Sequence, residues 1–208
     1  MKSLEGLHAI IGGASFERTL ELARIADDEG AAVIQLREKS LPTAELLRMA
    51  DAVRNVVHRA AFLVNDRADI AFAVGADGVH LGQDDLPAEV ARKILGPNAI
   101  IGMSAPNVEL AREAERNGVN YIGFGHMFPT NSKVKLSPPQ SIDALQAVID
   151  AIQIPVVIIG GIGMENIAQI LVPNLGGVAI IRAIRDAVNP RETIRMLVRT
   201  LEDHHAYT

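Results

Sequence analysis

Short apolar runs alternate along this chain with longer stretches in which apolar residues recur every three or four positions. Eight of the short runs have the length and composition of strands, at residues 7–11, 32–36, 62–64, 78–81, 100–103, 121–124, 155–159 and 177–181. The longer stretches predict amphipathic helices at residues 16–28, 43–58, 67–74, 108–117, 142–151, 164–171 and 191–201. A strand followed by a helix, repeated eight times, predicts a (β/α)8 TIM barrel, since a doubly wound open sheet has no need of an eighth unit.

The composition narrows the class of protein. The 208 residues are 49% hydrophobic and 22% charged, which suits one domain spanning residues 1–208 with a substantial core. The formal net charge of −5 gives no electrostatic footprint for nucleic acid or an anionic membrane, so we expect small-molecule partners. The sequence has no Cys, no recognisable secretory leader and no apolar run near the roughly 20 residues of a membrane span. We therefore expect a cytoplasmic protein, as a monomer or a homo-oligomer.

Acidic residues follow two neighbouring predicted strands. Asn65 and Asp66 come after the third strand, and Asp84 and Asp85 come after the fourth. Because the carboxyl ends of parallel strands lie side by side, carboxylates from both strands should meet there. Such carboxylates, with room left for water, are the ligands that octahedral Mg²⁺ needs when it also binds substrate phosphates. We predict that Asp66 and Asp85 bind Mg²⁺; the alternative is that each only caps the helix that follows.

Polar side chains also end the second predicted strand. Gln35 and Arg37 alternate onto the same face, and Lys39 follows them. A planar guanidinium and a mobile ammonium together suit a diphosphate, although a surface charge cluster would have the same sequence. This segment therefore predicts an anion site, with the surface cluster as its alternative.

Further candidates lie after the fifth and sixth strands. The Ser104 hydroxyl can orient a heterocycle through one hydrogen bond. Thr130, Ser132 and Lys133 supply donors for phosphate oxygens, although Thr and Ser after a Pro also occur in ordinary turns. The cation at Lys133 favours the phosphate site.

The last two strands end in a pattern typical of phosphate-binding barrels. Gly160 and Gly161 follow the seventh strand, and Ile181 and Arg182 end the eighth. Barrels frequently bind a phosphate between these two loops, because Gly lets the backbone approach the ligand. The pair predicts a second phosphate site.

Taken together, these motifs resemble the thiamine phosphate synthase family, within the synthase and thiazole tautomerase superfamily. The similar segments, in the family's order and spacing, are QLREK (35–39), VNDRADIA (64–71), GADGVHLGQDDLP (75–87), IGMSA (101–105), FPTNSK (128–133) and IGGI (159–162). The resemblance implies a transferase of thiamine biosynthesis that uses Mg²⁺. Such an enzyme joins 4-amino-2-methyl-5-hydroxymethylpyrimidine diphosphate to thiazole phosphate, giving thiamine phosphate and pyrophosphate. Departure of pyrophosphate would leave a pyrimidine cation that the thiazole nitrogen captures, so no protein nucleophile is expected.

The resemblance also implies roles for individual residues. The residues that would hold the pyrimidine diphosphate are Gln35, Arg37, Lys39, Asn65 and Lys133, with Ser104 against the pyrimidine and Asp66 and Asp85 on Mg²⁺. Those that would surround the thiazole phosphate are Thr130, Ser132, Gly161, Ile181 and Arg182. The residues expected to act in catalysis are Arg37, Ser104, His126 and Lys133.

Three positions depart from the family pattern, and they are the reason to consider other functions. Arg182 stands where the family usually has Ser, and Val134 stands where a second basic residue is frequent. His126 lies in a Gly-His-x-Phe segment that resembles the thiazole tautomerases, in which the His moves a proton. The alternatives are therefore a tautomerase with His126 as base, or a non-catalytic barrel that binds thiamine-type phosphates. The intact acidic pair and diphosphate cations favour the synthase.

Overall fold

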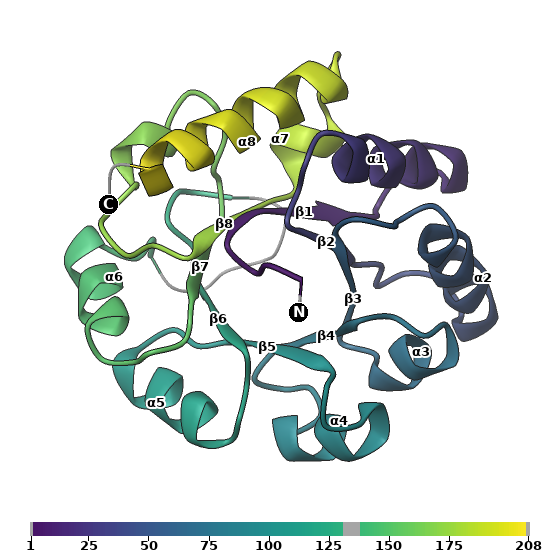
Figure 1. Cartoon of the computed structure of the whole chain (residues 1–208), viewed down its shortest axis with the longest axis horizontal. Helices are drawn as coiled ribbons and strands as arrows, with labels where there is room; N and C mark the ends of the chain where they lie inside the picture. Colours follow the sequence, from purple (N-terminus) through teal and green to yellow (C-terminus); the bar gives the residue numbers. More distant parts are fainter. Residues whose placement is uncertain (1, 131–137, 207–208) are drawn as a thin grey trace.

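Eight parallel strands form a closed barrel in the computed structural model, which describes residues 2–130 and 138–206. The strands lie in chain order around the ring, and the eighth pairs with the first (Figure 1). Their bounds are β1 (Gly6–Ile11), β2 (Val33–Leu36), β3 (Ala61–Asn65), β4 (Gly78–Leu81), β5 (Ile100–Ser104), β6 (Tyr121–Gly125), β7 (Val156–Ile159) and β8 (Gly177–Ile180). The predicted (β/α)8 fold and all eight predicted strands are confirmed.

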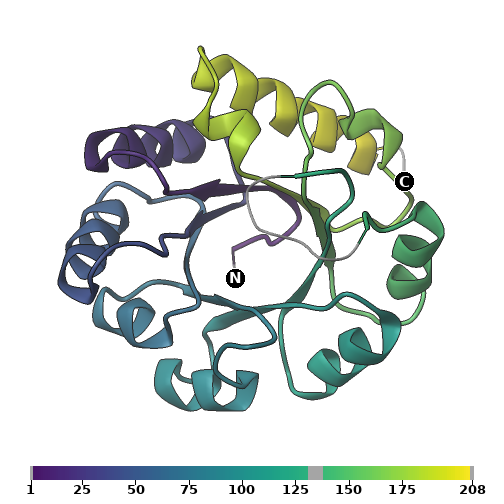
Figure 2. The same ribbon diagram turned by 180° about the vertical axis from the view of Figure 1, so that it is seen from behind.

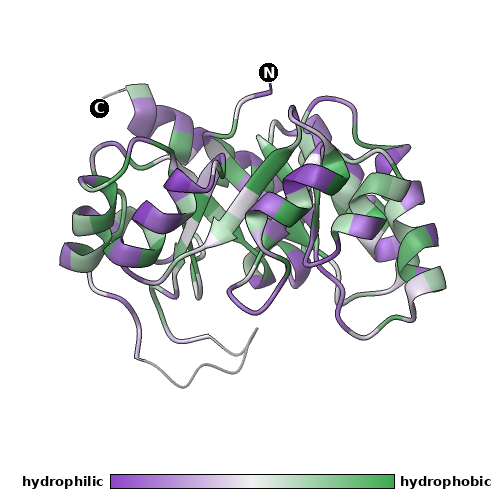
Figure 3. Cartoon of the chain, turned by 90° about the horizontal axis from the view of Figure 1, so that it is seen from below, coloured by the Kyte–Doolittle hydropathy of each residue, from purple (hydrophilic) through white to green (hydrophobic). Residues whose placement is uncertain are grey.

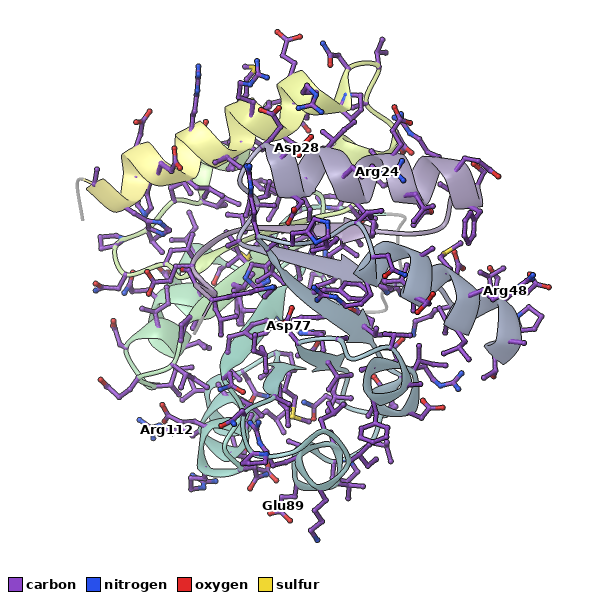
Figure 4. The ribbon with its side chains drawn as sticks, turned by 45° about the vertical axis from the view of Figure 1, so that its right-hand side comes forward. Arg24, Asp28, Arg48, Asp77, Glu89 and Arg112 are labelled. Carbon is purple, nitrogen blue, oxygen red and sulfur yellow. The ribbon has the colours of Figure 1, made fainter. Side chains whose placement is uncertain are left out.

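Helices surround the barrel on its outside, as the view from behind in Figure 2 shows. They are α1 (Phe16–Asp28), α2 (Thr43–Arg54), α3 (Ala68–Ala73), α4 (Ala88–Leu95), α5 (Val108–Arg116), α6 (Ile142–Ile149), the 3-10 helix η1 (Ile167–Gln169), α7 (Arg182–Arg185) and α8 (Pro190–Ala206). Charged side chains project from this outer layer, including Arg24 and Asp28 on α1, Arg48 on α2, Glu89 on α4 and Arg112 on α5 (Figure 4). Within the described residues, no helix is both long and apolar enough to span a bilayer.

The strands separate two hydrophobic cores. Alternate residues point outward to pack beneath the helices, as Ile34, Phe62 and Phe124 do, and these side chains are fully buried. The inward residues form a smaller core within the barrel that includes Leu63 and Tyr121. Figure 3 shows the hydrophobic residues running along the central strands, with hydrophilic and hydrophobic residues mixed along the helices.

The segment before β1 crosses the amino-terminal end of the barrel. Leu4 is 9% exposed and packs with the inner core. Lys2 donates to the Ala60 carbonyl at 2.7 Å and pairs with Asp77, which Figure 4 labels, at 3.1 Å. Because this end is covered, a ligand must approach from the carboxyl ends of the strands.

One predicted helix is wrong. Over residues 164–171 the structure has only the short 3-10 helix η1. The reason is Asn166, whose side chain accepts from the Gly163 amide at 2.9 Å and donates to the Gly161 carbonyl at 2.8 Å. These bonds tie the segment to the preceding loop in place of an α-helical turn, and Pro173 lies just beyond it.

The predicted second helix is too long, because α2 ends at Arg54 and not at residue 58. The Asp27 carboxylate accepts hydrogen bonds from the backbone amides of His58, Arg59 and Ala60 at 3.0, 2.9 and 2.8 Å. Three amides drawn to one carboxylate on α1 are incompatible with continued helix. Helices α4 and α7 were not among the predicted helices.

Candidate active site

A cavity of about 730 Å³ opens at the carboxyl ends of the strands. Every predicted site residue that the structure describes lines it: Gln35, Arg37, Lys39, Asn65, Asp66, Asp85, Ser104, His126, Thr130, Gly161, Ile181 and Arg182. Ser132 and Lys133 lie outside the described residues. Residues far apart in the sequence therefore meet in one cavity, as the carboxyl-end geometry of parallel strands requires.

The two predicted metal ligands lie beside each other. Burial raises the pKa of the Asp85 carboxyl, and the neighbouring Asp66 charge raises that pKa further. Lys39 Nζ lies 3.1 Å from Asp66 Oδ2 and partly balances the pair. Neither Asp caps a helix, because the N-cap positions of α3 and α4 are Arg67 and Pro87. The capping interpretation is therefore wrong.

The local backbone is shaped to bring these carboxylates into the cavity. Asp66 has a left-handed φ of 66°, an uncommon conformation for a residue other than Gly. Asp85 Oδ2 accepts a 2.6 Å hydrogen bond from the Gly82 amide, which holds the loop after β4 in a tight turn. The strained backbone at Asp66 and the tight turn closed by Asp85 bring these two carboxylates together, although their charges repel each other.

The oxygen atoms present here fit Mg²⁺. Asp66 and Asp85 supply hard carboxylate oxygens, and the buried Asn65 Oδ1 has no hydrogen-bond partner among the described residues. Among those same residues no cluster of three or more His, Cys, Asp or Glu could hold a metal. A cation bound by the two Asp would need further oxygens from water or a substrate, as is usual for Mg²⁺.

A carboxylate braces the cationic loop after β2. Glu38 accepts hydrogen bonds from the Gly13 amide at 2.8 Å and from Ser40 Oγ at 2.8 Å. Burial raises the Glu38 pKa, but hydrogen bonds from Ser40, Gly13 and Lys39 outweigh that effect and hold it below its ordinary value. Glu38 thus fixes the loop that carries Arg37 and Lys39, a role that the sequence analysis missed. Its position between two cations in the sequence was the available signal.

The loops after β6 and β7 pack closely enough to require Gly. Gly161 has a φ of 68°, and a Cβ there would lie 2.6 Å from the Pro129 carbonyl oxygen. Asn166 holds the Gly161 carbonyl, as described above. Thr130 and Gly161 therefore line the same side of the cavity. This side is where the sequence predicts the second phosphate.

Arg182 reaches the same cavity from the end of β8. Its Nε lies 3.2 Å from Asp186 Oδ2, and both side chains are about half exposed. An exposed i,i+4 pair of this kind is weak, so it leaves the guanidinium able to turn toward an anion. The position that departs from the family pattern therefore keeps a group suited to phosphate.

His126 is buried, with 5% of its surface exposed, and it lines the cavity. Its Nδ1 lies 3.0 Å from the Phe128 carbonyl oxygen, which can only accept, so Nδ1 carries the hydrogen. This hydrogen bond fixes the orientation of the ring in the cavity wall. The geometry suits either a positioning role or proton transfer.

Tyr121 and His80 also line the cavity, and the sequence analysis gave them no part in the site. Both lie on inward positions of their strands, as do Gln35 and Ser104. Polar residues repeated at inward positions were the signal that could have identified them.

Several known proteins with similar sequences are thiamine-phosphate synthases. The sequence model of the family described as thiamine monophosphate synthase matches residues 7–184. The thiamine-phosphate synthase of Chlorobium phaeovibrioides is 48% identical over 176 residues, which are 84% of either chain. That of Moorella thermoacetica is 46% identical over 181 residues, which are 86% of either chain. Among solved structures, a thiamine phosphate pyrophosphorylase from Pyrococcus furiosus superposes with a TM-score of 0.85 at 36% identity, covering 98% of both chains.

Proposed function

This chain belongs to the thiamine monophosphate synthase family, and from that premise we propose that it makes thiamine phosphate. The reaction joins 4-amino-2-methyl-5-hydroxymethylpyrimidine diphosphate to thiazole phosphate and releases pyrophosphate. The observation that carries this proposal is one cavity in which two acids, two cations and an unpartnered buried amide oxygen converge. A protein that bound only a monophosphate would have no use for this combination at the ends of β2, β3 and β4.

Mg²⁺ is part of the proposal, with Asp66 and Asp85 as its protein ligands. When bound, the ion would neutralise the charge that gathers on the departing pyrophosphate. Burial raises the Asp85 pKa and the Asp66 charge adds to this effect, and a divalent cation bound by both carboxylates would offset both, which supports this assignment. Asn65 would supply a further polar contact through its unpartnered Oδ1 or its amide group.

The cations at the end of β2 bind the leaving group in this proposal. Arg37 presents a planar fork for two phosphate oxygens, and Lys39, now paired with Asp66 at 3.1 Å, would share its charge with the diphosphate. Lys133 would add a third cation from the loop after β6. The C–O bond to the diphosphate breaks first, its electron pair leaves with pyrophosphate, and the thiazole nitrogen then forms the new C–N bond.

No protein nucleophile is needed for this sequence of steps. The chain has no Cys, and the residues of the cavity serve to bind and orient both substrates. Thr130, Ser132, Gly161, Ile181 and Arg182 would hold the thiazole phosphate, and Ser104 and Gln35 would orient the pyrimidine. Closely held substrates would supply much of the remaining rate.

A thiazole tautomerase is the second candidate function, and His126 is the observation that favours it. Its imidazole lines the cavity with Nδ1 donating to the Phe128 carbonyl, and imidazole is the side chain best suited to proton transfer near neutral pH. In the synthase, His126 would instead line the thiazole side of the cavity and help to position that ring.

Thiazole carboxylate phosphate, supplied separately as each tautomer, distinguishes the two functions. With Mg²⁺ and the pyrimidine diphosphate, native protein should release pyrophosphate with one tautomer, and His126→Gln should keep at least about a tenth of that rate. Loss of a general base usually costs about 10²- to 10⁴-fold. Native protein that interconverts the tautomers without ever releasing pyrophosphate would make the tautomerase the correct function.

A further inference from the structure

A chain of hydrogen bonds runs through the inside of the barrel, from its covered end to the cavity. His8 Nε2 lies 2.7 Å from the Leu4 carbonyl oxygen, and His8 Nδ1 lies 3.1 Å from the Gln35 side-chain nitrogen. The same Gln35 nitrogen lies 3.1 Å from the Tyr121 hydroxyl. The series of hydrogen bonds continues on the cavity side of Tyr121.

Two further bonds reach the cavity wall. The Tyr121 hydroxyl lies 2.8 Å from His80 Nδ1, and His80 Nε2 lies 3.0 Å from Ser104 Oγ. His8, Gln35 and Tyr121 are at most 2% exposed, so water does not compete for their bonds. We call these five side chains, His8, Gln35, Tyr121, His80 and Ser104, the relay.

The direction of every hydrogen in the relay follows from the Leu4 carbonyl. That oxygen can only accept, so His8 Nε2 carries the ring hydrogen. Burial lowers the pKa of His8 to about 4, which keeps the ring neutral and leaves Nδ1 as an acceptor. Gln35 must then turn its NH₂ group toward His8 and Tyr121, and its Oε1 remains as the acceptor at the other side of the amide.

The hydrogen bonds from Tyr121 to Ser104 have fixed directions as well. Tyr121 accepts a hydrogen from Gln35 and donates its own to His80 Nδ1, and burial raises the Tyr121 pKa, so the hydroxyl keeps that hydrogen. His80 then donates from Nε2 to Ser104 Oγ. Ser104 Oγ accepts this hydrogen, and its own hydrogen and second lone pair remain for a ligand in the cavity.

The barrel makes room for this relay at two glycines. A Cβ on Gly102 of β5 would collide with the Tyr121 ring. A Cβ on Gly123 of β6 would lie 2.9 Å from His80 Cε1. Larger residues at these inward positions would displace the two rings that connect Gln35 to Ser104.

We propose that His8 and Tyr121 are positioning residues that fix Gln35 as an acceptor and hold Ser104 in place, so that the cavity selects an aminopyrimidine over its oxo analogue. This inference rests on the proposed function for the identity of the ring. In the aminopyrimidine the exocyclic amine donates and the adjacent ring nitrogen accepts, which complements Gln35 Oε1 and the Ser104 hydroxyl. In the 4-oxo analogue the oxygen accepts and opposes Gln35 Oε1, whereas the ring N–H can still pair with the Ser104 lone pair that His80 leaves open. The Gln35 contact therefore carries the discrimination.

The test compares the binding of two ligands by three proteins. Calorimetric titrations with Mg²⁺ give the dissociation constants of the amino- and oxo-pyrimidine diphosphates for native protein, Tyr121→Phe and Phe124→Leu. Phe124 is a matched control because it is buried on the same strand but points into the outer core. Thermal unfolding of all three reports any general loss of stability. Nitrogen-15 NMR of the histidine rings reads the tautomers of His8 and His80 without reference to activity.

Native protein should bind the amino ligand about 5- to 150-fold more tightly, because the mispaired buried contact at Gln35 costs about 1–3 kcal/mol. Tyr121→Phe should lower this ratio severalfold, because Gln35 then keeps only one of the two acceptors that orient its NH₂ group, while Phe124→Leu keeps the native ratio. Both His8 and His80 should carry hydrogen on Nε2 in native protein. A native ratio that survives in Tyr121→Phe, or a native His80 with hydrogen on Nδ1, overturns the proposal.

Failure of the proposed function has a different signature. If native protein binds the amino ligand and releases pyrophosphate while Tyr121→Phe keeps full selectivity, the relay inference is wrong and the synthase stands. If native protein selects the amino ligand through the predicted tautomers yet never forms product, the inference stands and the synthase is wrong.

Discussion

His8 should make the barrel sensitive to acid in a pH range where carboxylates contribute little. The ring is fully buried and lies between the Leu4 carbonyl and the Gln35 amide. Burial lowers its pKa from the ordinary 6.5 to about 4, and the Leu4 hydrogen bond only partly opposes this. The folded protein therefore takes up the His8 proton at a lower pH than the unfolded chain does.

The size of the effect follows from the two pKa values. A pKa lowered on folding favours the folded state above pH 6.5, and this stabilisation is lost as the pH falls from 6.5 toward 4. The full difference corresponds to about 3 kcal/mol, at about 1.4 kcal/mol per pH unit. Between pH 7.5 and pH 5, the contribution of His8 to the free energy of unfolding should fall by about 2 kcal/mol.

Urea unfolding at pH 7.5 and pH 5, for native protein and His8→Gln, isolates this contribution. The other titrating groups are common to both proteins, so their effects cancel in the difference between the two pH dependences. The Gln amide can still donate to the Leu4 carbonyl, which limits the constant cost of the substitution. Native protein should lose about 2 kcal/mol more than the variant on going to pH 5. Equal losses in the two proteins would refute the argument that His8 is held neutral by burial.

Four further substitutions test the site and the packing of the relay. Asp66→Ala and Asp85→Ala should each abolish Mg²⁺-dependent pyrophosphate release while circular dichroism shows an intact fold, and retained activity in either variant removes that carboxylate from the metal site. Lys133→Ala should lower kcat by about 10²-fold or more with a smaller change in the thiazole KM, since its charge acts as the diphosphate departs; a change in KM alone would assign it to the other phosphate. Gly102→Ala should destabilise the fold by about 1–3 kcal/mol in urea unfolding, because its methyl group overlaps the Tyr121 ring, and an unchanged midpoint would contradict that overlap.

The strands were predictable because each buried run is short, apolar and bounded by turn residues. Residues 78–81 and 177–181 are such runs, and the structure has strands there. Helix ends depended on distant partners instead. The Asp27 carboxylate stops the chain after α2 from continuing as helix, although it lies on another helix and 31 residues away from His58. Local periodicity contains no information about such a contact.

The candidate site was predictable to the extent that its residues follow strand ends. Asp66 and Asp85 lie 19 positions apart in the sequence, and only the barrel topology brings their charges together. The relay was missed because Tyr121 and His80 lie within strands, where an apolar environment was assumed. The hydrogen bonds of the relay depend on distances across the inside of the barrel, and the spacing of residues along the sequence does not show these distances.

The most direct test of the central claim is the stoichiometry of product formation. Purified native protein is mixed with the pyrimidine diphosphate, thiazole phosphate and Mg²⁺, and thiamine phosphate and pyrophosphate are quantified over time, with a parallel sample in a chelator. The synthase predicts that both products appear in equal amounts and that the chelator stops them together. Consumption of neither substrate, or interconversion of thiazole tautomers with no pyrophosphate, would contradict it.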